Sequence, residues 1–146
     1  MINIILLHGW GCDSRTWQPL VPVLENIAQV TALDLPGFGS AAGSAQFNLP
    51  DVLTYLAAKI PDGSVVMGWS LGGMLAVQLA ATYPQKVCGV ITLAANAKFV
   101  ASEDYPYGMS VSVNGEFNQA FAHDPAAALK LFSGLSRKVI TTSGSY

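Results

Sequence analysis

Four short apolar runs alternate with segments of helical periodicity up to residue 95, and this alternation limits the possible folds more than any other feature. The runs predict strands at residues 4–7, 27–35, 64–69 and 87–94. The segments between them predict helices, which lie at residues 17–24, 49–60 and 71–83. Strands that alternate with helices predict an α/β fold, a parallel sheet flanked by helices, with residues 4–7 as a central strand.

The alternation stops after Ala95, and residues 98–115 show no clean period. A helix is then predicted over residues 116–122, with Phe117 and Phe121 on one face because they are four positions apart. The chain is therefore expected to change its organisation near residue 97.

A second short helix is predicted directly afterwards. Asp124 and Pro125 offer a helix N-cap followed by proline at the first helical position. We expect this helix to cover residues 126–132 and to end near Gly134. The polar residues 136–146 predict a truncated or frayed end.

Composition limits the partners of this chain. Charged residues make up only 11% of the sequence and the formal net charge is −2 without any basic run, which argues against nucleic-acid binding. No uninterrupted apolar stretch reaches the roughly 18 residues of a membrane span. The two cysteines match no metal-binding spacing and are too few for a disulfide framework. We expect a reduced, cytoplasmic setting and no metal or organic cofactor.

The strongest motif joins the third predicted strand to the helix after it. Residues 68–72 have the sequence Gly-Trp-Ser-Leu-Gly, which fits G-x-S-x-G in the strand–turn–helix context that this motif requires. Its glycines leave room for a strained turn that projects the Ser70 hydroxyl above the sheet edge. Ser70 is therefore predicted to be a nucleophile, the alternative being an N-capping serine in a glycine-rich turn.

A second motif follows the first strand, where residues 8–11 have the sequence His-Gly-Trp-Gly. An oxyanion hole in this architecture uses the backbone N–H after the nucleophile, here Leu71, and one N–H from the loop after an earlier strand, here Trp10. His8 has two interpretations, a catalytic base or a residue that braces the loop by hydrogen bonding. We favour the brace, because a base in this architecture follows the nucleophile along the chain.

The acid and the base of a catalytic triad are not evident. Asp34 precedes Ser70, so we predict a structural role in which it binds N–H groups of a turn. His123 is the only histidine after Ser70, but no late strand precedes it. Its candidate acids follow no strand closely either; they are Glu103, Asp104 and Glu116. We expect the acid and the base to lie in sequence outside this chain.

With these motifs, the chain resembles the α/β-hydrolase superfamily, and more narrowly the pimeloyl-[acyl-carrier protein] methyl ester esterases of biotin synthesis. Residues 8–11, 34–39 and 68–73 stand in the order and spacing of that family. Residues 105–121 resemble the start of its helical lid. The resemblance implies the N-terminal part of an α/β-hydrolase fold plus the start of a lid.

The resemblance also implies domains and site residues. Residues 1–97 correspond to the N-terminal half of the core, residues 98–135 to a partial helical lid, and residues 136–146 to the truncated or frayed end. Ser70 is the implied nucleophile, with Trp10 and Leu71 as oxyanion donors. The implied substrate contacts are Trp10, Phe117, Gln119 and Phe121.

The activity implied is hydrolysis of a carboxylic ester through an acyl-enzyme, on a methyl ester of an acyl chain carried by acyl-carrier protein. The family docks this acidic carrier through cations of its lid, whereas Lys98 and Lys130 are the only lid cations of this chain before Arg137. Two alternatives stay open. The first is another hydrolase or lyase of the superfamily, such as a thioesterase or a menaquinone-pathway enzyme. The second is a protein without catalysis, either a fragment that lacks the acid and the base or a ligand-binding pseudoenzyme.

Overall fold

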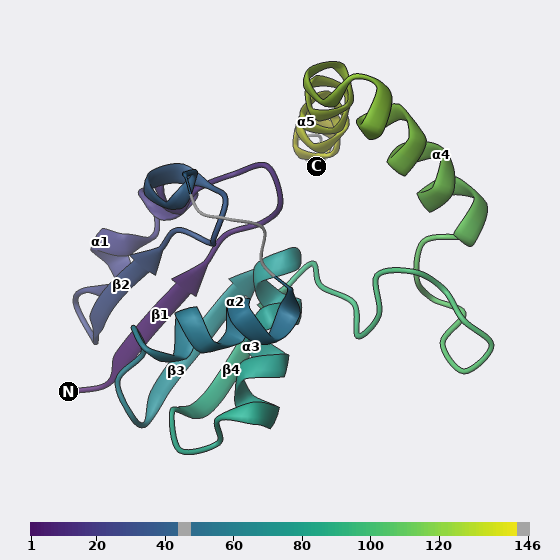
Figure 1. Ribbon diagram of the computed structural model, residues 1–146. Helices are drawn as coiled ribbons and strands as arrows, with labels where there is room; N and C mark the ends of the chain where they lie inside the picture. The colour runs from purple at the N-terminus through teal and green to yellow at the C-terminus, as the bar shows by residue number, and fades with distance from the viewer. Residues whose placement is uncertain (44–47, 143–146) are drawn as a thin grey trace. The chain divides into compact units, whose positions relative to one another are not determined.

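The computed structural model describes residues 1–43 and 48–142, and the chain divides into two compact units, Met1–Ala97 and Lys98–Tyr146 (Figure 1). Among the described residues, the four strands form a single sheet, which lies in the first unit. The second unit is built around two helices. In the part of the chain that is described, no helix is both long enough and apolar enough to cross a membrane.

The first unit holds a parallel four-stranded sheet, as the sequence predicted. Its strands are β1 (Asn3–Leu7), β2 (Gln29–Leu33), β3 (Ser64–Trp69) and β4 (Val87–Leu93), in the spatial order β2-β1-β3-β4. Every pairing is parallel, because each strand is connected to the next by a crossover on the face of the sheet. The prediction that residues 4–7 form a central strand is confirmed.

One face of the sheet is covered by α2 (Leu49–Ala57) and α3 (Leu71–Thr82). Successive side chains of a strand point to opposite faces, so alternate residues of β1 and β3 meet these helices. The buried residues of this layer include Ile5, Leu7, Leu56, Val66 and Leu79. This packing fixes α3, and with it the turn that joins β3 to α3.

The opposite face is covered by η1 (Ser14–Trp17) and α1 (Val21–Leu24). Its buried residues include Ile4, Leu6, Trp17 and Met67. The prediction of a helix over residues 17–24 is only partly right, because Pro22 distorts such a helix: its ring would clash with the carbonyl four residues before it. The structure instead has a 3₁₀ turn and then a single α-helical turn with proline in its first positions.

The second unit contains α4 (Val111–His123) and α5 (Pro125–Thr142). The prediction that α4 begins at residue 116 is wrong: the Val113 N–H donates to Ser110 Oγ at 3.3 Å, and this N-cap starts the helix earlier.

The helix α5 continues past Gly134, where the sequence predicted an end. A glycine inside a helix costs only about 1 kcal/mol relative to alanine, and the neighbouring turns outweigh this. Residues 136–142 are therefore helical, and the rest of the predicted frayed end, residues 143–146, lies outside the described residues.

Candidate active site

The turn between β3 and α3 has a strained backbone at Ser70. This residue has φ of 53° and ψ of −116°, a conformation that residues other than glycine rarely adopt. Its N–H donates to the Leu93 carbonyl at 2.8 Å, and its carbonyl accepts from the Gly73 N–H at 2.9 Å. These hydrogen bonds hold the turn in a conformation that would otherwise relax, which is the geometry expected of a nucleophile elbow.

The glycines on either side of Ser70 allow very close backbone contacts. A Cβ atom on Gly68 would lie 2.1 Å from the carbonyl oxygen of Gly72. A Cβ atom on Gly72 would lie 2.2 Å from the carbonyl oxygen of Leu7, at the end of β1. Only glycine fits at either position, so the first turn of α3 packs directly against the end of the neighbouring strand.

The turn after β1 starts beside this elbow. Leu7 pairs with Gly68 across the sheet, so residues 8–11 and Ser70 follow adjacent parallel strands at the same edge. The two turns also touch, because a Cβ atom on Gly9 would lie 2.9 Å from the Trp69 ring. The structure thus brings together the three predicted residues Trp10, Ser70 and Leu71, each of them partly exposed.

His8 is fully buried and uses both nitrogens of its ring. The Leu35 N–H donates to Nε2 at 2.9 Å, and Nδ1 donates to the Gly9 carbonyl at 2.8 Å. The Phe38 ring packs edge-on against the imidazole, with centroids 5.5 Å apart. A histidine with both nitrogens engaged cannot accept a proton from Ser70, so the geometry favours the brace over the base.

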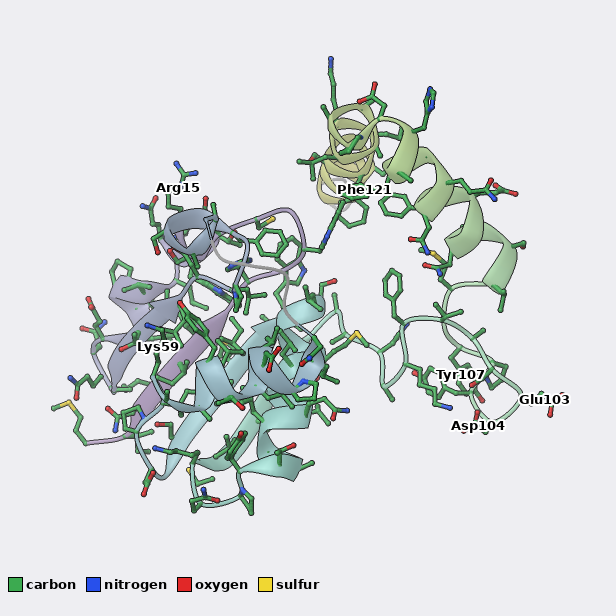
Figure 2. All side chains as sticks on the ribbon, viewed as in Figure 1. Arg15, Lys59, Glu103, Asp104, Tyr107 and Phe121 are labelled. Atoms are coloured by element: carbon green, nitrogen blue, oxygen red, sulfur yellow. The ribbon has the colours of Figure 1, made fainter. Side chains whose placement is uncertain are left out.

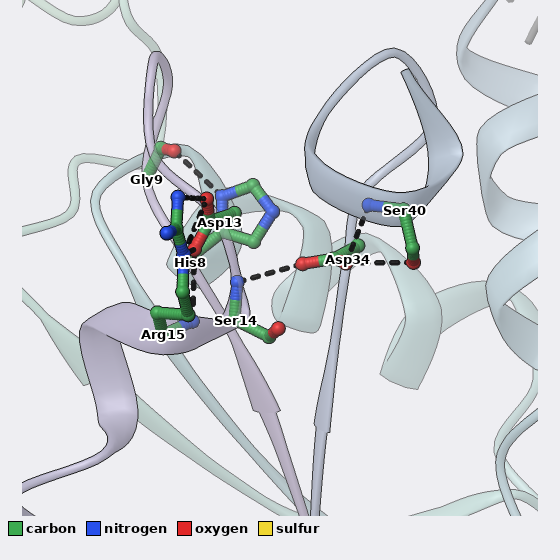
Figure 3. A network of polar contacts seen from close by, with 7 residues as sticks. All are labelled: His8, Gly9, Asp13, Ser14, Arg15, Asp34 and Ser40. Atoms are coloured by element: carbon green, nitrogen blue, oxygen red, sulfur yellow. Dashed lines mark hydrogen bonds and ion pairs between the residues drawn. The ribbon is translucent and has the colours of Figure 1, made fainter. Parts of the chain in front are cut away.

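Asp34 connects the start of η1 to the turn after β2 (Figure 3). Its carboxylate accepts from the Ser14 N–H at 2.7 Å, from the Ser40 N–H at 2.8 Å and from the Ser40 hydroxyl at 2.7 Å. Burial opposes ionisation, but the hydrogen bonds from Ser14 and Ser40 outweigh it and hold the pKa of Asp34 well below its usual range. These contacts agree with the structural role predicted for Asp34.

Of the three substrate contacts predicted in the second unit, two lie together and Gln119 lies apart from them. On α4, the rings of Phe117 and Phe121 are stacked with centroids 6.3 Å apart, and Phe121 is labelled in Figure 2. Gln119 is exposed and lies on another side of the helix, two positions from Phe117. The sequence prediction missed Phe132 of α5, whose ring lies 6.3 Å from that of Phe117. In the sequence, Phe132 lies four residues after Ala128 in the predicted helix over residues 126–132, and this spacing of two apolar residues was the signal that could have found it.

The candidates for acid and base in the second unit are solvent-exposed. His123 is the last residue of α4, and Asp104 precedes that helix. The Asp104 carboxylate pairs with Lys98 Nζ at 2.7 Å and accepts from the Ser102 hydroxyl at 2.6 Å. This carboxylate is therefore engaged within its own loop. Within residues 1–43 and 48–142, no His, Cys, Asp and Glu side chains are grouped so that three or more could hold a metal ion.

Comparison with known proteins agrees with the fold described above. A family model described as the alpha/beta hydrolase fold matches residues 2–141. The chain belongs to this family. A hydrolase from Oleispira antarctica has a similar structure, with a TM-score of 0.74 and 18% identity over 88% of this chain and 50% of that protein. At this identity the likeness shows the fold alone, and it agrees with the α/β-hydrolase fold predicted from the sequence.

Two curated relatives are more similar in sequence. The "Biotin biosynthesis bifunctional protein BioHC" of Cellvibrio japonicus is 56% identical over 132 residues, which are 90% of this chain and 26% of that protein. The "Pimeloyl-[acyl-carrier protein] methyl ester esterase" of Aeromonas hydrophila is 37% identical over 132 residues, which are 89% of this chain and 52% of that protein. The chain therefore spans about half of one relative and about a quarter of the other.

Proposed function

We propose that this chain supplies the nucleophile and the oxyanion hole of a serine carboxylic-ester hydrolase. The observation that carries the proposal is the strained backbone of Ser70, in a turn that packs against residues 8–11. Backbone strain of this kind persists at functional sites, where the surrounding structure enforces it. The hydrogen bonds of Ser70 and the close contacts of Gly68 and Gly72 provide that enforcement.

In the proposed reaction, Ser70 Oγ attacks the ester carbonyl while a base takes its proton. The N–H groups of Leu71 and Trp10 donate to the oxyanion of the tetrahedral intermediate. The alcohol leaves with a proton, and water then hydrolyses the acyl-enzyme to release the acid and regenerate Ser70. His8 is engaged on both nitrogens, and the exposed His123 ends a helix and follows no strand. The chain also spans only about half of the Aeromonas hydrophila relative. We therefore propose that the acid and the base of this reaction come from other parts of a longer protein.

The proposed substrate is a methyl ester of an acyl chain carried by acyl-carrier protein. The name of the Aeromonas hydrophila relative supports this substrate. We assign residues 1–97 to the N-terminal half of the hydrolase core and residues 98–135 to part of a lid. The aromatic group of Phe117, Phe121 and Phe132 would contact the acyl chain, together with Trp10 and Gln119.

The test compares this chain with the complete open reading frame that contains it, using p-nitrophenyl esters and a fluorophosphonate probe. We expect the longer protein to hydrolyse the esters and to be labelled on Ser70, and Ser70→Ala to abolish both. This chain alone is expected to be nearly inactive, because an enzyme without its triad base keeps only about 10³–10⁴-fold catalysis over water. Labelling of the longer protein that survives Ser70→Ala would refute the proposal.

A second measurement tests the acyl-chain contacts. Phe117→Ala in the longer protein should reduce the preference for long over short acyl chains by roughly 10-fold, since burying an aromatic side chain is worth about 1.5–3 kcal/mol. The matched control is Val113→Ala, an apolar residue of the same helix that is 50% exposed. Equal preferences in the two variants would place the acyl chain elsewhere.

A further inference from the structure

We propose that His8 is a positioning residue that sets the direction of the Trp10 N–H through the carbonyl group of Gly9. This inference rests on the proposed function, in which the Trp10 N–H is an oxyanion donor. It goes further than a brace of the loop, because it assigns His8 an effect on one particular hydrogen-bond donor. His8 itself is fully buried, so it acts through the peptide group and not on the substrate.

A backbone N–H of the turn after β2 determines which nitrogen of His8 carries the proton. The Leu35 N–H donates to Nε2 at 2.9 Å, so Nε2 must be the acceptor. In a neutral imidazole the proton is then on Nδ1. Nδ1 lies 2.8 Å from the Gly9 carbonyl oxygen, to which it can only donate. The tautomer of His8 is thus fixed by a backbone group that is distant in the sequence.

This hydrogen bond fixes the orientation of the peptide group between Gly9 and Trp10. A trans peptide is planar, and its C=O and N–H point in opposite directions. The Gly9 carbonyl accepts from His8 Nδ1 and also from the Cys12 N–H at 3.3 Å. Because the carbonyl is held on that side, the Trp10 N–H must point to the other side.

A glycine at this position makes such control necessary. Without a Cβ atom, Gly9 has more accessible backbone conformations than any other residue, and its peptide group could rotate. A side chain at this position would collide with the Trp69 ring, only 2.9 Å from the position of a Cβ atom. The close contact between the two turns therefore requires glycine, and the hydrogen bond from His8 replaces the restriction that a side chain would have provided.

Two substitutions of His8 each keep one of its two hydrogen bonds and remove the other. The amide nitrogen of an asparagine can occupy the place of Nδ1, so His8→Asn can still donate to the Gly9 carbonyl. The amide oxygen of a glutamine can occupy the place of Nε2, so His8→Gln can still accept from the Leu35 N–H but offers no donor at the δ position. Both variants lose one buried hydrogen bond, and they should lose similar thermal stability.

The kinetic test uses the complete open reading frame. We expect His8→Gln to lower kcat about 10- to 100-fold with KM within about 3-fold, somewhat less than the 10²–10³-fold that follows removal of an oxyanion donor. His8→Asn should keep kcat within about 3-fold of the unmodified protein. Equal losses of kcat in the two variants would reduce His8 to a structural residue and overturn the inference.

An activity-independent test uses this chain itself and distinguishes the inference from the proposed function. We expect ¹⁵N NMR of the unmodified chain to show His8 protonated on Nδ1, and the Trp10 amide signal to shift more in His8→Gln than in His8→Asn. A proton on Nε2 overturns the inference without need of a variant, even if the protein is an esterase. A different pair of results would refute the proposed function alone. In that case the NMR spectrum shows the proton on Nδ1 as expected, but Ser70→Ala leaves the esterase activity and the labelling of the longer protein unchanged.

Discussion

Two glycines in two helices show how differently the two units of this chain are built. Gly72 of α3 lies so close to β1 that a Cβ atom would be 2.2 Å from the Leu7 carbonyl oxygen. Gly115 of α4 has nothing within 4 Å of such an atom. Glycine is unfavourable in both helices, but only Gly72 permits a backbone contact that positions the candidate site. A glycine in a helix is therefore informative only together with what lies against it.

Burial follows the same division. In the first unit, Leu56 and Leu79 are fully buried, and they pack α2 and α3 onto the sheet. In the second unit, Val111 and Leu131 are 68% and 66% exposed. The first unit therefore has a core that holds its turns in place, whereas α4 and α5 leave much of their apolar surface uncovered.

The largest expected effect on stability comes from substituting Gly72, and it should be far larger than that of substituting Gly115. Gly72→Ala should destabilise the first unit by more than about 4 kcal/mol, because the added methyl group meets backbone that cannot move without displacing β1. Tryptophan fluorescence measures this directly, since all three tryptophans belong to the first unit. A thermal transition of Gly72→Ala close to that of the unmodified chain would show that α3 can move away from β1 at little cost.

The next effect compares two leucines. Leu79→Ala should lower the free energy of unfolding by about 2–5 kcal/mol, because it removes a fully buried side chain and leaves a cavity. The exposed Leu131 is the matched control, and Leu131→Ala should change stability by less than about 0.5 kcal/mol. Denaturant titration checks both variants. Similar losses in the two would mean that Leu131 is covered by a partner in solution.

A smaller effect on stability is expected at Asp34, whose carboxylate accepts hydrogen bonds from Ser14 and Ser40. Asp34→Asn should cost about 1 kcal/mol at neutral pH, because an amide accepts these hydrogen bonds less well and the site is partly exposed. Since folding lowers the pKa of Asp34, its contribution is present above the ordinary pKa of about 4 and is lost as the pH falls below that value.

Thermal unfolding of Asp34→Asn and of the unmodified chain between neutral and acidic pH measures this contribution. The comparison variant is Asp104→Asn in the second unit, whose carboxylate makes an exposed pair with Lys98 and should matter less. The stability difference between Asp34→Asn and the unmodified chain should shrink as the pH falls, and a difference that grows would contradict the prediction.

The smallest effect is a gain. Gly115→Ala should stabilise the second unit by about 0.5 kcal/mol, since the added methyl group meets open space and alanine is the better helix former. Far-ultraviolet circular dichroism during thermal unfolding detects such a shift in the helical signal. If Gly115→Ala were destabilising, another surface would have to pack against this side of α4.

The parts of the fold that depend on local sequence were predictable. The apolar run that ends at Leu7 and the glycine spacing around Ser70 predicted a central strand and a strained turn, and both are present. The boundaries of the helices in the second unit were harder to predict from the sequence. The Ser110 N-cap and the continuation of α5 past Gly134 depend on small energies that tertiary context decides.

The contacts that join distant segments were not predictable in detail. Asp34 was expected to bind N–H groups of a turn, but nothing in the sequence pairs it with both Ser14 and Ser40. The same holds for the hydrogen bond between His8 and the Leu35 N–H. Such contacts arise only when the sheet brings the ends of β1 and β2 together, so a pattern along one segment cannot reveal them.

The backbone conformation of Ser70 has a consequence for protein engineering. With φ of 53° and ψ of −116°, position 70 favours glycine, and any other residue there makes folding less favourable by about 1–3 kcal/mol. A library of variants selected for heat resistance alone would therefore be enriched in glycine at this position, and it would lose the hydroxyl group on which the proposed chemistry depends. Stabilisation of this protein should leave position 70 unchanged and seek its gains in α4 and α5.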